Sequence, residues 1–214
     1  MGLLKKYFNN TRRPEGLLGK ILLRDMNKAH AAVSDWGLSQ LTGLKPAAIA
    51  DLGCGGGRNV ARLLELFPSA VVTAVDYAEV SVAKTIRFNR REILQGRCQV
   101  LRGDVSSLPL EEGVLDLVTA FETVYFWPGP VTSFREVCRV LKPEGLFLIV
   151  NDSDGSRPDD RKWCKLIDGM RIYDSGQLTA YLKEAGFGEV IMNHDAARHR
   201  LCLLAKKEKT SFYE

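Results

Sequence analysis

The chain has 214 residues, of which 45% are hydrophobic and 26% are charged, and its formal net charge is +4. This balance is typical of a globular protein with a substantial core, and it excludes a disordered or collagen-like chain. No apolar run approaches the roughly 18 residues that a membrane span needs, and the N-terminal segment lacks the apolar core of a signal peptide. We therefore expect a cytoplasmic protein with no membrane partner.

The N-terminal segment, residues 1–45, is expected to form a helical cap on the rest of the domain. Leu18, Ile21, Leu22 and Met26 recur at the spacing of one helix face. A helix with such a stripe buries it against a neighbouring element. This segment is therefore a candidate lid.

From residue 47 onward, short apolar runs alternate with amphipathic segments, which is the pattern of an α/β fold with a parallel sheet. Several runs are apolar at nearly every position, as expected of strands that helices cover on both faces. Val60, Leu63, Leu64 and Phe67 keep helical spacing and predict a helix with one buried stripe. In chain order the first five runs are AAIADLG, AVVTAVD, CQVLRGDV, LDLVTAF and GLFLIVND.

The C-terminal part, residues 174–214, is expected to form a helix and a hairpin. Asp174 with Gln177 three residues later resembles a capping box, and Gly186 suits the left-handed position past a helix end. The last two runs, EVIMNHDA and RHRLCLLAKK, have only two or three residues between them, too few for a parallel crossover. The sequence therefore predicts a doubly wound, three-layer α/β/α fold whose seven-stranded sheet is parallel except for the last strand.

The chain is interpreted as one domain, residues 1–214, with a cofactor-binding core at 46–152 and a polar insertion at 153–173. In open α/β sheets, ligands bind beyond the carboxyl ends of the strands, and the insertion emerges at that edge. The insertion is therefore a second candidate lid. Its Trp163 and Tyr173 are expected to line a substrate pocket.

The stretch ADLGCGGGRNV, residues 50–60, is the most informative part of the chain. Its glycines, at positions 53, 55, 56 and 57, permit positive φ angles and let a ligand approach where a Cβ atom would collide. A helix that starts near Arg58 would point its free N–H groups at such a ligand. The dinucleotide fingerprint would need a third glycine at position 58, so the pattern indicates a different nucleotide-like ligand.

Three carboxylates follow successive strands. Asp51 precedes the first glycine, Asp76 ends the second run, and Asp104 ends the third. The carboxyl ends of parallel strands meet at one edge of a sheet, so these side chains are expected to line that edge. A pyrophosphate would be repelled by Asp51 beside its own loop, whereas a cationic ligand would be favoured.

With these residues the chain resembles a class I S-adenosylmethionine-dependent methyltransferase from about Ala47 to its C-terminus. The resemblance lies in DLGCGGG, AVDY, GDVSSLP and LKPEGLFLIV. It implies a Rossmann-like sheet and S-adenosyl-L-methionine as the cofactor. It also implies that Asp76 holds the ribose hydroxyls and that Asp104 faces the adenine amino group.

The resemblance extends to further cofactor contacts. Tyr77 would cover one face of the adenine and Val105 the other, while Cys54 would be small filler between the glycines. Asp51 would either approach the methionine amino group, directly or through water, or order the glycine loop. The predicted cofactor-binding residues are Asp51, Gly53, Cys54, Gly55, Gly57, Asn59, Asp76, Tyr77, Asp104, Val105 and Phe121.

The segment LVTAFETVYFWP, residues 117–128, lies where the family places the residues nearest the methyl group. It contains neither an NPPY tetrapeptide nor a proline-cysteine nucleophile. Glu122 could act as a general base or orient an amine, or it could hold neighbouring backbone N–H groups. Tyr125 could donate a hydrogen bond to a substrate oxygen, and His30 on the N-terminal segment is a third catalytic candidate beside a purely structural role. No metal site is expected, because no His and carboxylate cluster has ligand spacing.

The predicted activity is methyl transfer to a small-molecule acceptor by in-line SN2 displacement, in a monomer or homodimer. The chain is similar to the ubiquinone and menaquinone methyltransferase type of domain but departs from its quinone-specific patterns, so the acceptor stays open. An RNA methyltransferase is an alternative because of the arginines between Arg87 and Arg102, although no interleaved aromatic residues form a stacking platform there. A non-catalytic regulatory protein that binds S-adenosylmethionine is the other alternative.

Overall fold

The computed structural model describes residues 14–209, without the side chains of residues 17, 18, 20, 21 and 24. The described residues form one seven-stranded sheet in the order β3-β2-β1-β4-β5-β7-β6. Strand β7 runs antiparallel to both of its neighbours, and the other adjacent pairs are parallel. The strands are β1 (Ala48–Leu52), β2 (Val71–Asp76), β3 (Cys98–Arg102), β4 (Leu115–Phe121), β5 (Leu141–Asn151), β6 (Phe187–Asp195) and β7 (Arg200–Lys207).

This topology confirms the predicted doubly wound fold with an antiparallel last strand. The turn between β6 and β7 is longer than predicted, because β6 ends at Asp195 and β7 begins at Arg200. The helix before β6 has the predicted capping box, in which Gln177 N donates to Asp174 at 2.8 Å. Gly186 beyond the helix has a φ of +105°, as predicted.

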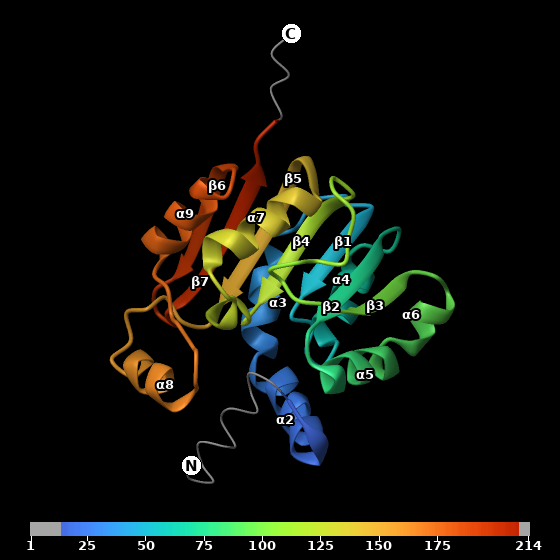
Figure 1. The fold of residues 1–214 in the computed structure, drawn as a ribbon, viewed down its shortest axis with the longest axis horizontal. Helices are drawn as coiled ribbons and strands as arrows, with labels where there is room; N and C mark the ends of the chain where they lie inside the picture. The colour runs from blue at the N-terminus through green and yellow to red at the C-terminus, as the bar shows by residue number, and fades with distance from the viewer. Residues whose placement is uncertain (1–13, 210–214) are drawn as a thin grey trace.

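Helices cover both faces of the sheet (Figure 1). Val33 and Leu38 of α3 and Leu63 of α4 pack on one face, and Phe134 of α7 and Leu178 of α9 pack on the other. The helices are α2 (Gly16–Ala29), α3 (Ala31–Ser39), α4 (Arg58–Leu66), α5 (Glu79–Phe88), α6 (Arg90–Leu94), α7 (Pro130–Val140), α8 (Asp160–Leu166) and α9 (Ser175–Glu184), with a 3-10 turn η1 (Val124–Phe126).

The N-terminal segment forms two helices, α2 and α3, that meet at His30. Of the predicted stripe, Leu22 is buried and Met26 is partly buried, whereas the side chains of Leu18 and Ile21 lie outside the described ones. Helix α3 packs closely on β5, because a Cβ atom at Gly37 would lie 2.4 Å from Val150 Cγ2. Helix α2 extends past the carboxyl ends of the strands (Figure 1). It therefore lies where a ligand would bind.

Within residues 14–209, no helix has both the length and the apolar character to cross a membrane. The five cysteines are free thiols. No group of three or more His, Cys, Asp or Glu side chains in the described part of the chain could hold a metal ion.

Candidate active site

A cavity of about 340 Å³ opens at the carboxyl edge of the sheet, beneath α2. Its volume lies near the lower end of the ~300–1,000 Å³ of small-molecule sites. The wall is built from residues of five segments, within 14–34, 53–59, 75–81, 103–105 and 121–128. Among the predicted cofactor residues, the wall contains Gly53, Cys54, Gly55, Asn59, Asp76, Tyr77, Asp104, Val105 and Phe121, and leaves out Asp51 and Gly57.

The glycine loop connects β1 to α4, and its residues 53, 55 and 57 have positive φ angles of 75°, 52° and 78°. A Cβ atom at Gly53 would lie 2.4 Å from Thr123 Cγ2, so this glycine permits close approach of another part of the chain. For a Cβ atom at Gly55 the nearest neighbour would be Leu23 Cδ2, at 3.7 Å, so the backbone there is open to the cavity. The loop thus forms a cradle for a ligand.

Gly57 faces away from the cavity and packs against α5. A Cβ atom there would lie 3.0 Å from Thr85 Cα, and Asn89 Nδ2 donates to the Gly57 carbonyl at 3.1 Å. The same helix also supports Cys54, whose Sγ lies 3.5 Å from Thr85 Oγ1. Gly57 therefore positions the loop from behind.

Asp76 is fixed at the wall by its own backbone neighbours. Its Oδ2 accepts a hydrogen bond from Gly55 N at 2.9 Å, and its Oδ1 accepts one from Ala78 N at 2.8 Å. Burial raises the pKa of this carboxyl, and the two backbone donors oppose that rise. A carboxylate oriented in this way can accept hydrogen bonds from a pair of hydroxyl groups.

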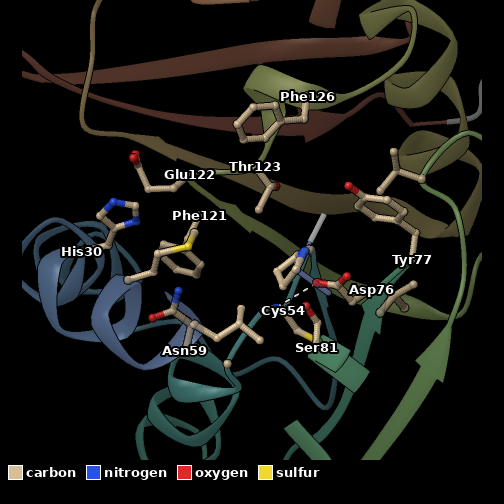
Figure 2. A pocket seen from close by; sticks show the side chains of 18 of the residues that line it. His30, Cys54, Asn59, Asp76, Tyr77, Ser81, Phe121, Glu122, Thr123 and Phe126 are labelled. Atoms are coloured by element: carbon tan, nitrogen blue, oxygen red, sulfur yellow. Dashed lines mark hydrogen bonds between the residues drawn. The ribbon is translucent and has the colours of Figure 1, made fainter. Parts of the chain in front are cut away.

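Asp104 lies in the wall but also orders its own turn. Its Oδ1 accepts hydrogen bonds from Ser106 N at 2.8 Å and from Ser106 Oγ at 2.6 Å. Tyr77, whose side chain lies on the same side of the pocket as Asp76, is 38% exposed (Figure 2). Together with Val105 it supplies the flat and apolar surface that an aromatic ring would need.

Asp51 is buried beneath the glycine loop and does not reach the cavity wall. Thr119 Oγ1 on β4 donates to its Oδ1 at 2.8 Å. Burial raises the pKa of Asp51 to about 7, a rise that the Thr119 hydrogen bond opposes and the charge of Asp76 reinforces. This geometry anchors Asp51 to β4, and both roles that the sequence left open stay predictions.

Helix α2 contributes a stripe to the wall that the sequence interpretation found only in part. Leu23, Met26, Asn27 and His30 all line the cavity. Asn27 Nδ2 donates to the Gly56 carbonyl at 3.3 Å and so joins α2 to the glycine loop. The signal was present in the sequence, because these four positions have the i, i+3, i+4, i+7 spacing of one helix face.

Glu122 lies at the end of the pocket opposite Asp76 and Tyr77, and His30 lies at the same end (Figure 2). The backbone of Glu122 is left-handed, with a φ of +59°, which is uncommon for a residue other than glycine. Burial raises the pKa of Glu122 to about 8, and the hydrogen bond from the Asp152 backbone N–H opposes this rise. For His30, burial lowers the pKa, and the negative charge of Asp152 opposes that change.

Tyr125 lies behind Glu122 and is not part of the cavity wall. Its hydroxyl donates to Glu122 Oε1 at 3.3 Å and accepts a hydrogen bond from Ser153 N at 3.1 Å. The Asp152 backbone N–H also donates to Glu122 Oε1. Tyr125 is therefore placed to orient Glu122, and a direct hydrogen bond to substrate stays a prediction.

The insertion contributes no described residue to the cavity wall. Trp163 on α8 is 37% exposed, and Tyr173 is buried with its ring edge-on to Tyr181 at 5.8 Å between centroids. The expectation that Trp163 and Tyr173 line the substrate pocket is wrong, because the chain after β5 leads away from α2 and Tyr173 joins the core beside α9.

Comparison with known proteins shows similarity to methyltransferases. Residues 50–149 match the family model described as a methyltransferase domain. The malonyl-[acyl-carrier protein] O-methyltransferase of Geobacter sulfurreducens is 36% identical over 114 residues, which cover 53% of this chain and 42% of that protein. Cycloartenol-C-24-methyltransferase 1 of Oryza sativa subsp. japonica is 29% identical over 165 residues, which cover 72% of this chain and 47% of that protein. The chain thus spans about half the length of these curated relatives.

A solved structure shares the fold over most of the chain. The S-adenosylmethionine-dependent methyltransferase from Aquifex aeolicus superposes with a TM-score of 0.71 and 18% sequence identity, covering 87% of this chain and 97% of that one. At this identity the likeness concerns the fold alone.

Proposed function

From the premise that the chain carries a methyltransferase domain of the class I S-adenosylmethionine-dependent type, we propose that it methylates a small-molecule acceptor by in-line SN2 displacement. The observation that carries the proposal is the cavity wall, in which Asp76 and the open backbone at Gly55 lie at one end and Glu122 and His30 at the other. The first end fits a nucleoside, and the second presents two groups, Glu122 and His30, that can accept or donate a proton.

The described residues fit the cofactor in the chemistry they offer. Asp76 would bind the ribose hydroxyls, Asp104 would face the adenine amino group, and Tyr77 would cover the ring. When bound, the cofactor supplies a methyl group on a positively charged sulfur. Asn59 and Phe121 belong to the same wall and would surround the methionine part.

The far end of the pocket supports a small acceptor with apolar character. Glu122 and His30 lie at this end, and the wall of the same cavity also includes the apolar side chains of Met26, Phe126 and Trp127. Holding the acceptor in line with the S–CH3 bond and excluding water would be the main sources of rate. The two relatives are named for an acyl-carrier-protein substrate and for cycloartenol, neither of which is a nucleic acid.

Calorimetry with S-adenosylmethionine and S-adenosylhomocysteine tests the cofactor assignment. We expect both to bind the wild-type chain and Asp76→Ala to weaken binding at least tenfold, because about 1.4 kcal/mol of hydrogen bonding accounts for that factor. Asp195→Ala is the matched control, since this carboxylate lies on β6, pairs with Arg198 and is absent from the wall. An affinity that Asp76→Ala leaves unchanged would overturn the role of Asp76.

An acceptor screen then separates an enzyme from a non-catalytic binding protein. A domain that binds the cofactor but methylates nothing in a broad metabolite screen would support the regulatory alternative. Retention of RNA at low salt that weakens steeply as salt rises would support the RNA alternative.

A further inference from the structure

Glu122 is held rigidly on one side and open on the other. Its Oε1 accepts hydrogen bonds from the Asp152 backbone N–H and from the Tyr125 hydroxyl. Within the described part of the chain, Oε2 forms no hydrogen bond, and it is not among the fully enclosed polar atoms. Because Glu122 belongs to the cavity wall, this second oxygen is available to the ligand.

Three charged side chains lie behind the carboxyl and outside the wall. Asp152, at the exit of β5, is paired with Arg200 Nε of β7 at 3.0 Å and lies 3.8 Å from Arg157 Nη1 of the insertion. Segments that are distant in sequence therefore meet at Asp152, whose backbone N–H holds Glu122.

The wall itself offers no free cation to Glu122. Arg58 is the one lysine or arginine among the described wall residues, and it belongs to the glycine-loop side. Its guanidinium pairs with Asp35 at 2.7 Å. Glu122 is therefore the carboxyl that a positively charged ligand would approach at the end of the pocket opposite Asp76.

Without a ligand, Glu122 and His30 both favour their uncharged forms near neutral pH. Burial raises the pKa of Glu122 to about 8; the Asp152 charge reinforces the rise, and the Arg157 charge and the Tyr125 hydrogen bond oppose it. Burial lowers the pKa of His30, so this imidazole is unprotonated at pH 8. Glu122 is then the group that carries an exchangeable proton at this end.

We propose that Glu122 holds a proton that leaves when the sulfonium-bearing cofactor binds and is restored by the acceptor during methyl transfer, with Asp152 and Arg157 as the residues that tune this exchange. The inference rests on the proposed function. Its physical basis is that a nearby positive charge favours the ionised form of a carboxyl, whereas the neutral thioether of the product does not.

The charges and atoms balance across the step. The acceptor lone pair forms the new bond to the methyl carbon as the S–CH3 electron pair moves to sulfur, which becomes neutral. The acceptor proton passes to Glu122, so the net charge of the pocket is unchanged. The substrate class that fits is an acceptor whose reacting atom carries both a lone pair and a proton, such as a hydroxyl group or a neutral amine, on an apolar body.

Proton release on cofactor binding tests the inference without any acceptor. Calorimetric titrations at pH 8, in buffers with different ionisation enthalpies, give the number of protons released by S-adenosylmethionine and by S-adenosylhomocysteine. If the sulfonium lowers the Glu122 pKa by about one unit, the lower end of the range for a close charge, the first ligand releases about 0.4 proton more than the second. Glu122→Gln should abolish this difference while both ligands still bind.

Two further variants distinguish an electrostatic effect on the pKa of Glu122 from structural damage to the site. Asp152→Asn should move the pH of greatest release downward, and Arg157→Gln should move it upward, because their charges have opposite effects on Glu122. Loosening of the site would admit water and move both variants in the same direction. Arg135→Gln is the control, since Arg135 pairs with Glu184 away from the pocket and should change nothing.

Two results would contradict the inference. One is equal proton release by the two ligands in the wild-type chain, and the other is a difference that persists in Glu122→Gln. The failure of either ligand to bind would instead overturn the proposed function. The two failures are therefore distinguishable in one set of titrations.

Discussion

At the cofactor end of the pocket, Asp76 is fixed by two backbone N–H groups that come from neighbouring turns of the same motif. At the acceptor end, Glu122 is fixed by a tyrosine hydroxyl and a backbone N–H, and charges from distant segments surround it. The first arrangement keeps a carboxylate ready to accept hydrogen bonds. The second leaves a carboxyl whose charge can change.

In this proposal, the carboxylate that binds the cofactor and the carboxyl that exchanges a proton lie at opposite ends of one pocket. Burial raises the pKa of both carboxyls, and hydrogen-bond donors oppose the rise at both. The difference lies in the surroundings: the pKa of Glu122, about 8, also depends on the charges of Asp152 and Arg157. A titrating group near the working pH is suited to proton transfer. Three substitutions test this separation.

Gly53→Ala should disrupt the glycine loop and remove most of the affinity for the cofactor. The new Cβ atom would lie 2.4 Å from Thr123 Cγ2, at a φ of +75° that favours glycine. We expect the affinity for S-adenosylhomocysteine, measured by calorimetry, to fall at least about 100-fold, which corresponds to about 2.7 kcal/mol.

The control for this variant is Gly43→Ala. Gly43 has a φ of +88°, but a Cβ atom there would meet nothing within 4 Å. Both variants carry a similar backbone cost, so only the collision with Thr123 differs. Equal affinities in the two variants would show that the close approach of the loop to Thr123 does not matter for binding.

Glu122→Gln should change stability only where the wild-type carboxyl would ionise. Because the pKa of Glu122 is raised from 4.5 to about 8, the folded state binds more protons than the unfolded state between these values, and stability falls as pH rises through that window. Gln keeps the acceptor oxygen without the charge. We expect it to be more stable than wild type at pH 9 by roughly 2 kcal/mol, allowing for partial exposure, with little gain at pH 4.

Urea unfolding at the two pH values measures this gain. The exposed Glu111→Gln is the control and should behave alike at both. A Glu122→Gln variant that gains no stability at pH 9 relative to pH 4 would argue against a protonated carboxyl at this position.

Asn27→Ala tests how far α2 belongs to the cofactor end. It removes the hydrogen bond to the Gly56 carbonyl, and one such bond contributes about 1 kcal/mol. Affinity for S-adenosylhomocysteine should fall about fivefold. Lys28→Ala, an exposed neighbour on the same helix, should leave the affinity unchanged; an equal loss in both variants would indicate a general loosening of α2.

The sequence predicted the cofactor end better than the acceptor end for a physical reason. Gly53, Gly55 and Asp76 act through local backbone geometry, which the order of residue types encodes directly. The fold was equally readable, because buried strands and capped helices leave periodic patterns. Asp51 and Gly57 were recognised as parts of the motif, but which side of the loop each one faces depends on its packing against Thr119 and α5.

The acceptor end depends on contacts between distant positions. Arg157 and Arg200 meet Asp152, whose backbone N–H holds Glu122, only after β5, the insertion and β7 are in place, and no spacing rule links these residues. The left-handed backbone of Glu122 also has no signature in its residue type. The insertion was predicted as a lid because it emerges at the correct edge, yet its direction after β5 depends on tertiary packing.

A crystal structure of the chain with S-adenosylhomocysteine tests the division of the pocket most directly. We expect ribose hydroxyls on Asp76, adenine beside Tyr77 and Asp104, and the sulfur turned toward the end that holds Glu122 and His30. A cofactor bound in the reverse orientation, or one whose sulfur faces away from Glu122, would contradict this expectation.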